Sequence, residues 1–121
     1  MIVVVWVGVM LLGGFGAVAR FSLDRAVSKR FARSFPLGTL VVNLSGAFLL
    51  GFLAGLALHP HLALLAGTGF VGSYTTFSTW MLETQRLGEE RQVAVAFANV
   101  AVSVALGLVA AWVGQAIGTA L

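Results

Sequence analysis

The chain has 121 residues, of which 60% are hydrophobic and 9% are charged, and its mean hydropathy is +1.02. A soluble domain carries about 25% charged residues, so the composition indicates an integral membrane protein rather than a soluble domain. The net charge of +3 is too small for a nucleic-acid-binding patch, and the absence of cysteine excludes a disulfide framework and a thiolate nucleophile.

Four hydrophobic runs predict an all-α integral membrane protein with short loops. Turns at Ser34-Phe35-Pro36 and His59-Pro60-His61 separate the first three runs, because proline ends a preceding helix. The predicted spans cover about residues 2–30, 37–58, 62–87 and 92–119 of a single domain, 1–121. The first span ends in a basic stretch that contains Arg20, Arg25, Lys29 and Arg33. Four helices barely enclose a site, so we expect an oligomer.

The third span is expected to be discontinuous. Its apolar first part, residues 62–72, has 11 residues and would rise only about 16 Å as a helix, roughly half of a bilayer. The polar stretch Gly72-Ser73-Tyr74-Thr75-Thr76-Phe77-Ser78-Thr79-Trp80 follows. Irregular backbone survives at membrane depth only beside protein or a cavity, because lipid offers no hydrogen-bonding partner. A break near residues 73–76, with Ser or Thr capping a helix that restarts from Phe77, therefore predicts a pore or a ligand site.

Polar side chains also mark one face of spans two and four. Asn43 follows Thr39 by one turn, and Asn99 shares a face with Ser103 and Gly107. A buried asparagine in a span commonly bonds a neighbouring helix, for roughly 1 kcal/mol, and this interpretation of Asn43 alone stays open. The Asn43 amide and the Thr39 hydroxyl are equally suited to donate to a passing anion.

In span three, Thr76, Thr79 and Glu83 fall on one stripe, and Phe77 and Trp80 fall on an adjacent one. Any single stripe is explained by helix packing. Polar stripes on three of four helices are harder to explain in that way, and together they predict a polar track.

Two charged residues have alternative interpretations. Inserting an arginine at the bilayer centre costs about 3 kcal/mol, so Arg20 is expected near the interface. There it is either an interfacial anchor or a vestibule cation that concentrates anions. Glu83 repels anions, so helix capping or a pair with Arg86 is its simpler role.

No serine has an evident base partner, which argues against an enzyme, and His59 and His61 lack a third metal ligand nearby in sequence.

These residues resemble the Fluc/CrcB family of small fluoride channels. The resemblance covers all four spans, and its most specific part is the Thr-Thr-Phe-Ser-Thr core with Val-Asn-x-x-Gly. The matching segments are Gly13-Gly14 to Gly16-Ala17, Arg20-Phe21, Gly38-Thr39-Leu40-Val41-Val42-Asn43-Leu44-Ser45-Gly46, and Gly69-Phe70-Val71-Gly72-Ser73-Tyr74-Thr75-Thr76-Phe77-Ser78-Thr79.

The resemblance implies an antiparallel, dual-topology homodimer in the inner membrane of a prokaryote. Its two pores would let fluoride leave the cell passively and so lower cytoplasmic fluoride. A structural sodium ion at the dimer centre would be held by the main-chain carbonyls of Gly72 and Thr75, with no organic cofactor. The implied anion pathway uses Asn43, Phe77, Trp80, Thr39, Thr76, Thr79, Asn99 and Ser103, with Arg20 and Glu83 near the vestibules.

One position departs from the family pattern. The family usually has a second phenylalanine three residues after the first, and this chain has Trp80 there. Tryptophan also has an electropositive ring edge and adds an N–H donor, so anion contact is compatible with it.

The charge distribution conflicts with dual topology. All seven Lys and Arg residues lie at the first and third connections, which predicts both termini outside the cell. Pairing with an oppositely inserted paralogue is therefore an alternative to the homodimer.

Two other functions compete. A small dual-topology, proton-coupled multidrug or guanidinium exporter needs a carboxylate in its first helix, and residues 2–19 contain none. A non-transporting assembly subunit would use the glycines for packing but leaves the polar stripes unexplained.

Overall fold

The structure, a computed structural model, describes residues 2–31 and 35–121, and within them every regular element is helical. Arg33 and Ser34, which belong to the predicted basic end and the first predicted turn, lie outside the described residues. Three of the described helices are long and apolar enough to cross a membrane: α1 (Ile2–Arg30), α2 (Leu37–Leu56) and α6 (Val93–Ala120). The chain is therefore an α-helical protein with three candidate membrane spans.

The third hydrophobic run is bent and broken. Its first half is continuous through α3 (Pro60–Ala63), η1 (Leu64–Val71) and α4 (Gly72–Tyr74), and α5 (Ser78–Glu89) follows as a separate helix. The irregular segment covers residues 75–77, close to the expected break at 73–76. The restart at Ser78 comes one residue after the position expected from the sequence.

The first half also differs from the regular α-helix expected for it. η1 is π-helical, and the Gly72 amide donates to the Gly67 carbonyl five residues earlier. Sequence patterning does not separate this geometry from an α-helix, because both place apolar side chains on all faces of so apolar a segment.

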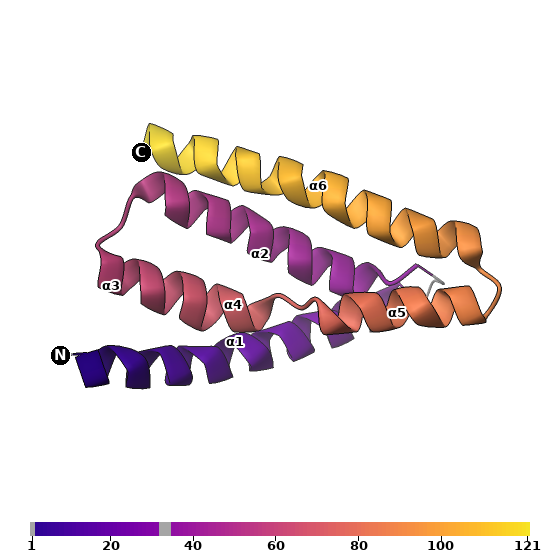
Figure 1. Ribbon diagram of the computed structural model, residues 1–121, viewed down its shortest axis with the longest axis horizontal. Coiled ribbons are helices and arrows are strands. Elements are labelled where there is room, and N and C mark those ends of the chain that lie inside the picture. The colour runs from indigo at the N-terminus through magenta and orange to yellow at the C-terminus, as the bar shows by residue number, and fades with distance from the viewer. Residues whose placement is uncertain (1, 32–34) are drawn as a thin grey trace.

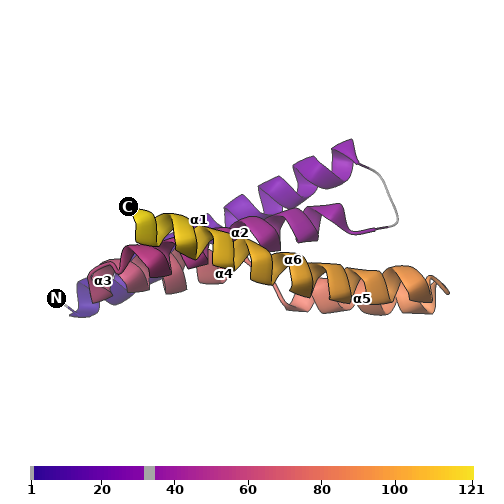
Figure 2. The ribbon, with the colours of Figure 1, turned by 90° about the horizontal axis from the view of Figure 1, so that it is seen from above.

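The elements lie roughly side by side along the long axis of the molecule (Figure 1). α2 lies between α6 and the broken helix, and α1 packs on the opposite side of the broken helix. The C-terminus, the start of α1 and the α2–α3 connection lie at one end, whereas the end of α1, the start of α2 and the α5–α6 connection lie toward the other. Figure 2 shows that the basic end of α1 rises away from α5 and α6.

Glycines hold α2 and α6 at backbone contact. A Cβ atom added at Gly51 would overlap the Ala111 carbonyl, and one at Gly114 would overlap the Phe48 carbonyl. Gly55 and Gly118, each four residues on, make the same close approach to the opposite backbone. Two such four-residue glycine pairs facing each other are typical of helix association in membranes, where small residues allow van der Waals packing.

Candidate functional site

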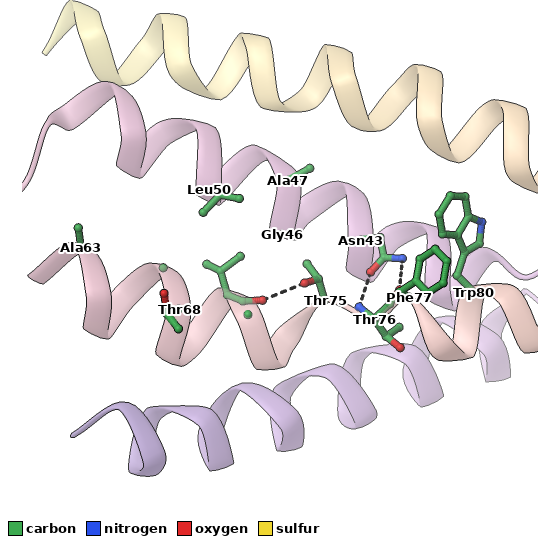
Figure 3. A pocket seen from close by; sticks show the side chains of 13 residues that line it. Asn43, Gly46, Ala47, Leu50, Ala63, Thr68, Thr75, Thr76, Phe77 and Trp80 are labelled. Atoms are coloured by element: carbon green, nitrogen blue, oxygen red, sulfur yellow. Dashed lines mark hydrogen bonds between the residues drawn. The ribbon is translucent and has the colours of Figure 1, made fainter. Parts of the chain in front are cut away.

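The break in the third hydrophobic run, between α4 and α5, is held by a side chain of α2. The Thr76 amide donates to Asn43 Oδ1 at 2.8 Å, and Asn43 Nδ2 donates to the Thr76 carbonyl at 2.8 Å (Figure 3). Because the backbone is extended at Thr75, the amide and the carbonyl of Thr76 lack the hydrogen bonds that they would make within a helix. The Asn43 side chain replaces both bonds. Phe77, the residue before α5, has no capping side chain, but Thr76 Oγ1 accepts from the Thr79 amide at 3.2 Å, so a threonine bonds the first turn of the restarted helix.

This arrangement frees two carbonyl oxygens. In a continuous helix the Thr76 amide would donate to Gly72 and the Thr79 amide would donate to Thr75. Here the first amide is directed to Asn43 and the second to the Thr76 hydroxyl. The carbonyls of Gly72 and Thr75, which are the pair assigned to sodium by the family resemblance, therefore lose their usual helical donors.

An open groove of about 700 Å³ runs along the break (Figure 3). Asn43, Thr76, Phe77 and Trp80 line it, as do Gly72 and Thr75. The Phe77 ring is 69% exposed, and its centroid lies 5.8 Å from that of Trp80 with the ring planes at 85°. In an edge-to-face pair of this kind the hydrogens of one ring edge, which carry partial positive charge, point at the face of the other ring.

A second groove of about 280 Å³ lies on the other side of this wall. It shares Asn43, Ala47 and Trp80 with the first groove and adds Ser103 and Gly107 of α6. The structure therefore brings Ser103 and Gly107, two members of the expected stripe on span four, to the same wall as Asn43 and Trp80.

Three of the predicted pathway residues line neither groove. Thr39 is 2% exposed, and its hydroxyl donates to a Glu83 carboxylate oxygen at 2.5 Å. Asn99 is 1% exposed and Thr79 is half-buried. The partner of Glu83 is thus a hydroxyl on α2, a third possibility beside the helix cap and the Arg86 pair considered from the sequence.

Asn99 belongs to a small network that joins α5 to α6. Its side-chain Nδ2 donates to Thr84 Oγ1 at 2.8 Å, and Thr84 Oγ1 donates to the Trp80 carbonyl at 2.8 Å. The Trp80 indole Nε1 donates to the Asn99 carbonyl at 3.3 Å and closes the ring of bonds. Sequence reasoning missed Thr84, although its spacing of four residues from Trp80 was a signal that both lie on one face of α5.

Arg20 reaches the other side of the break. Its Nε donates to the Ser73 carbonyl at 3.4 Å, at the end of the first half-helix. A cation at a helix C-terminus complements the partial negative charge of the terminal carbonyls. Ser45 and Tyr74, also missed from the sequence, add a hydroxyl pair at 2.8 Å that joins α2 to the same half-helix.

Comparison with known proteins identifies the family of the chain. The family model described as "CrcB-like protein, Camphor Resistance (CrcB)" matches residues 7–115. The chain belongs to the CrcB family.

Curated relatives of this CrcB chain are named as fluoride-specific ion channels. It is 69% identical over 113 residues to "Fluoride-specific ion channel FluC 2" of Mycobacterium tuberculosis (strain ATCC 25618 / H37Rv), with 93% of this chain and 90% of that protein covered. It is 71% identical to the protein of the same name from Mycolicibacterium paratuberculosis, with 93% of each chain covered. Identity to "Fluoride-specific ion channel FluC 1" of Symbiobacterium thermophilum is 44%, covering 93% of this chain and 96% of the other.

Proposed function

We propose that this protein is a fluoride-selective ion channel that lets fluoride leave the cell passively and so lowers cytoplasmic fluoride. The observation that carries the proposal is the 69% identity to a fluoride-specific ion channel over nearly the whole chain. The groove at the helix break, with an amide and two aromatic side chains on its wall, supplies a matching chemistry. The process is conduction, which needs no catalytic group and no organic cofactor.

Fluoride selectivity follows from the kind of groups on this wall. A small anion must exchange a strongly bound hydration shell for protein donors, and the idealised cost of removing an ion of carboxylate size from water is on the order of 20 kcal/mol. Amide, hydroxyl and ring-edge donors return that energy in steps, whereas a fixed positive charge in the narrowest part would hold the ion too tightly. Asn43, Phe77 and Trp80 are the groups we assign to this part of the path, with Thr76 and Ser103 beside them.

The remaining pathway assignments follow the family resemblance. We place Thr39, Thr79 and Asn99 along the track behind the groove wall and Arg20 and Glu83 near the vestibules. In a single chain the hydroxyl of Thr39 and the amide of Asn99 already have partners. Their roles would therefore be to orient neighbouring groups as much as to touch the ion.

The working unit we propose is an antiparallel dimer of two chains, each crossing the membrane four times, in the inner membrane of a prokaryote. The groove is open along one side and Phe77 is 69% exposed, so a second copy is needed to enclose a path. The broken helix would form the fourth crossing, because its two halves together span about 60–89. The basic residues at one end of the molecule favour an oppositely inserted paralogue as the alternative partner.

The same dimer would hold a structural sodium ion at its centre. The carbonyls of Gly72 and Thr75 have the required chemistry, since unwound backbone carbonyls at mid-membrane commonly coordinate sodium. Two carbonyls from each of two chains would supply four oxygen ligands. The fit is supported by the displaced helical donors of both carbonyls.

The proposal is tested by ion efflux from liposomes that contain the purified protein, with separate fluoride, chloride and proton-coupled cation gradients. We expect fluoride efflux, little chloride efflux and no proton-coupled cation exchange. Chloride efflux as fast as fluoride efflux would contradict selectivity, and proton-coupled cation exchange would support the exporter instead.

Phe77→Ile is the sharpest variant in that assay. The substitution keeps an apolar, though shorter, side chain and removes the aromatic ring with its positive edge, so fluoride efflux should fall severely. A variant with unchanged efflux would remove Phe77 from the path.

A further inference from the structure

Trp80 has one hydrogen-bond donor, and the structure directs it away from the groove. An indole carries a single N–H and no acceptor. The Trp80 Nε1–H donates to the backbone carbonyl of Asn99 at 3.3 Å. The ring therefore contributes its carbon edge and face to the wall shared by the two grooves, while its polar atom is bonded to α6.

The bonds around Trp80 hold both its ring and its backbone. The Asn99 side chain donates to Thr84, and the Thr84 hydroxyl donates to the Trp80 carbonyl. Asn99 is thus bonded through its backbone to the indole and through its side chain to the helix that carries the indole. Asn99 is 1% exposed, whereas Trp80 and Thr84 are half-buried, so the network is shielded from competing water at its Asn99 end.

We propose that Asn99 and Thr84 are positioning residues whose network tethers Trp80, fixing the angle of its indole and thereby the orientation of the Phe77–Trp80 pair. On this basis the anion meets the carbon edge of Trp80, and the indole N–H is never its donor. A phenylalanine at this position would present a similar edge but has no atom with which to bond Asn99. The inference deepens the proposed function and rests on it.

The alternative is that the indole N–H itself donates to fluoride. The two assignments differ in what Thr84 does. Thr84 lines neither groove and contacts no anion in either assignment. Removing its hydroxyl disturbs the indole only if the network sets the position of the ring.

Indole ¹H–¹⁵N resonances provide a direct readout on the complete, reconstituted protein. The chain has three tryptophans, and the Trp80 signal is identified by its loss in Trp80→Phe. We expect this signal to move in Thr84→Val and to stay at the wild-type position in Thr84→Ser, which keeps the hydroxyl. A Trp80 signal that does not move in Thr84→Val would overturn the tether.

A fluoride titration of the wild-type protein decides between tether and donor, and it needs Trp80→Phe only to identify the Trp80 signal. The Trp80 indole signal should shift by no more than its line width. A saturating, fluoride-dependent shift of that signal would instead establish the N–H as an anion donor.

Efflux measurements connect the tether to conduction. Thr84→Val should lower fluoride efflux several-fold, Thr84→Ser should restore it, and combining Thr84→Val with Trp80→Phe should lower efflux no further than Trp80→Phe alone, because both act through one network. Fully additive losses would contradict this. The position of the Trp80 indole signal in Thr84→Val and in Thr84→Ser is measured in fluoride-free buffer, so it tests the tether even in a protein that conducts no fluoride. Failure of the tether and failure of the proposed function are therefore distinguished.

Discussion

Replacing Asn43 tests whether the helix break depends on α2. Asn43→Ala removes the acceptor for the Thr76 amide and the donor to the Thr76 carbonyl, both at 2.8 Å. No other side chain of the described part of the chain bonds these two backbone groups. At membrane depth water does not replace the lost partners, so the broken conformation should lose stability.

The size of the loss follows from measured interhelical hydrogen bonds. Such bonds contribute about 0.6 kcal/mol on average and at most about 1.7 kcal/mol, so two of them amount to roughly 1–3 kcal/mol. Each 1.4 kcal/mol corresponds to about a tenfold change in an equilibrium constant. The free energy of unfolding, measured by denaturant titration in mixed micelles, should therefore fall by that amount, and fluoride efflux should fall with it.

Asn43→Asp is the matched control. It is nearly isosteric and keeps an oxygen that accepts from the Thr76 amide, but it replaces the donor with a second acceptor, which faces the Thr76 carbonyl. Its loss of stability should also be measurable, and protonation at low pH should reduce it by restoring a donor. If Asn43→Ala lowered fluoride efflux while leaving the free energy of unfolding unchanged, Asn43 would act on the ion alone. The clamp, meaning the two hydrogen bonds between Asn43 and Thr76, would then be refuted as the support of the break.

Two further predictions concern packing and the proposed sodium ion. Gly114→Ala should destabilise the protein by about 1–3 kcal/mol, because the new Cβ overlaps the Phe48 carbonyl. Gly107→Ala, in the same helix but with no atom within 4 Å of the added Cβ, should cause no such loss; equal thermal midpoints for the two would count against the glycine interface. If sodium binds as proposed, replacing it with a large organic cation should lower the thermal midpoint of the reconstituted protein, since the carbonyls of Gly72 and Thr75 would then lack a partner; an unchanged midpoint would argue against the proposed sodium site.

The break in the third helix was predictable from the chain, whereas its support was not. A short apolar run followed by glycine, serine and threonine departs from the composition of a span, and that local signal located the irregular segment. The partner of Thr76 lies 33 residues earlier, on another helix. Helical periodicity placed Asn43 one turn after Thr39 on the same face of span two, but periodicity does not specify which neighbour an amide meets.

The stripes on span four show the same limit. Asn99 and Ser103 share one face of α6, as their spacing predicted, yet they have different neighbours along the helix axis. Asn99 meets Thr84 of α5, and Ser103 lines the second groove. A stripe defines a direction around a helix; the environment at each level depends on which other element ends or begins beside it. For the same reason the N–H of Trp80, considered from the sequence as an anion donor, bonds α6 in the structure.

The clamp between Asn43 and Thr76 also constrains biogenesis. During synthesis α2 emerges first, so its amide is already in the membrane when Thr76 arrives 33 residues later. Until the two meet, the irregular backbone has no partner in lipid, and the third segment is better stabilised as a straight helix or at the water interface. The break is therefore acquired when the segment packs against α2, and a peptide of residues 60–89 made alone would not keep it.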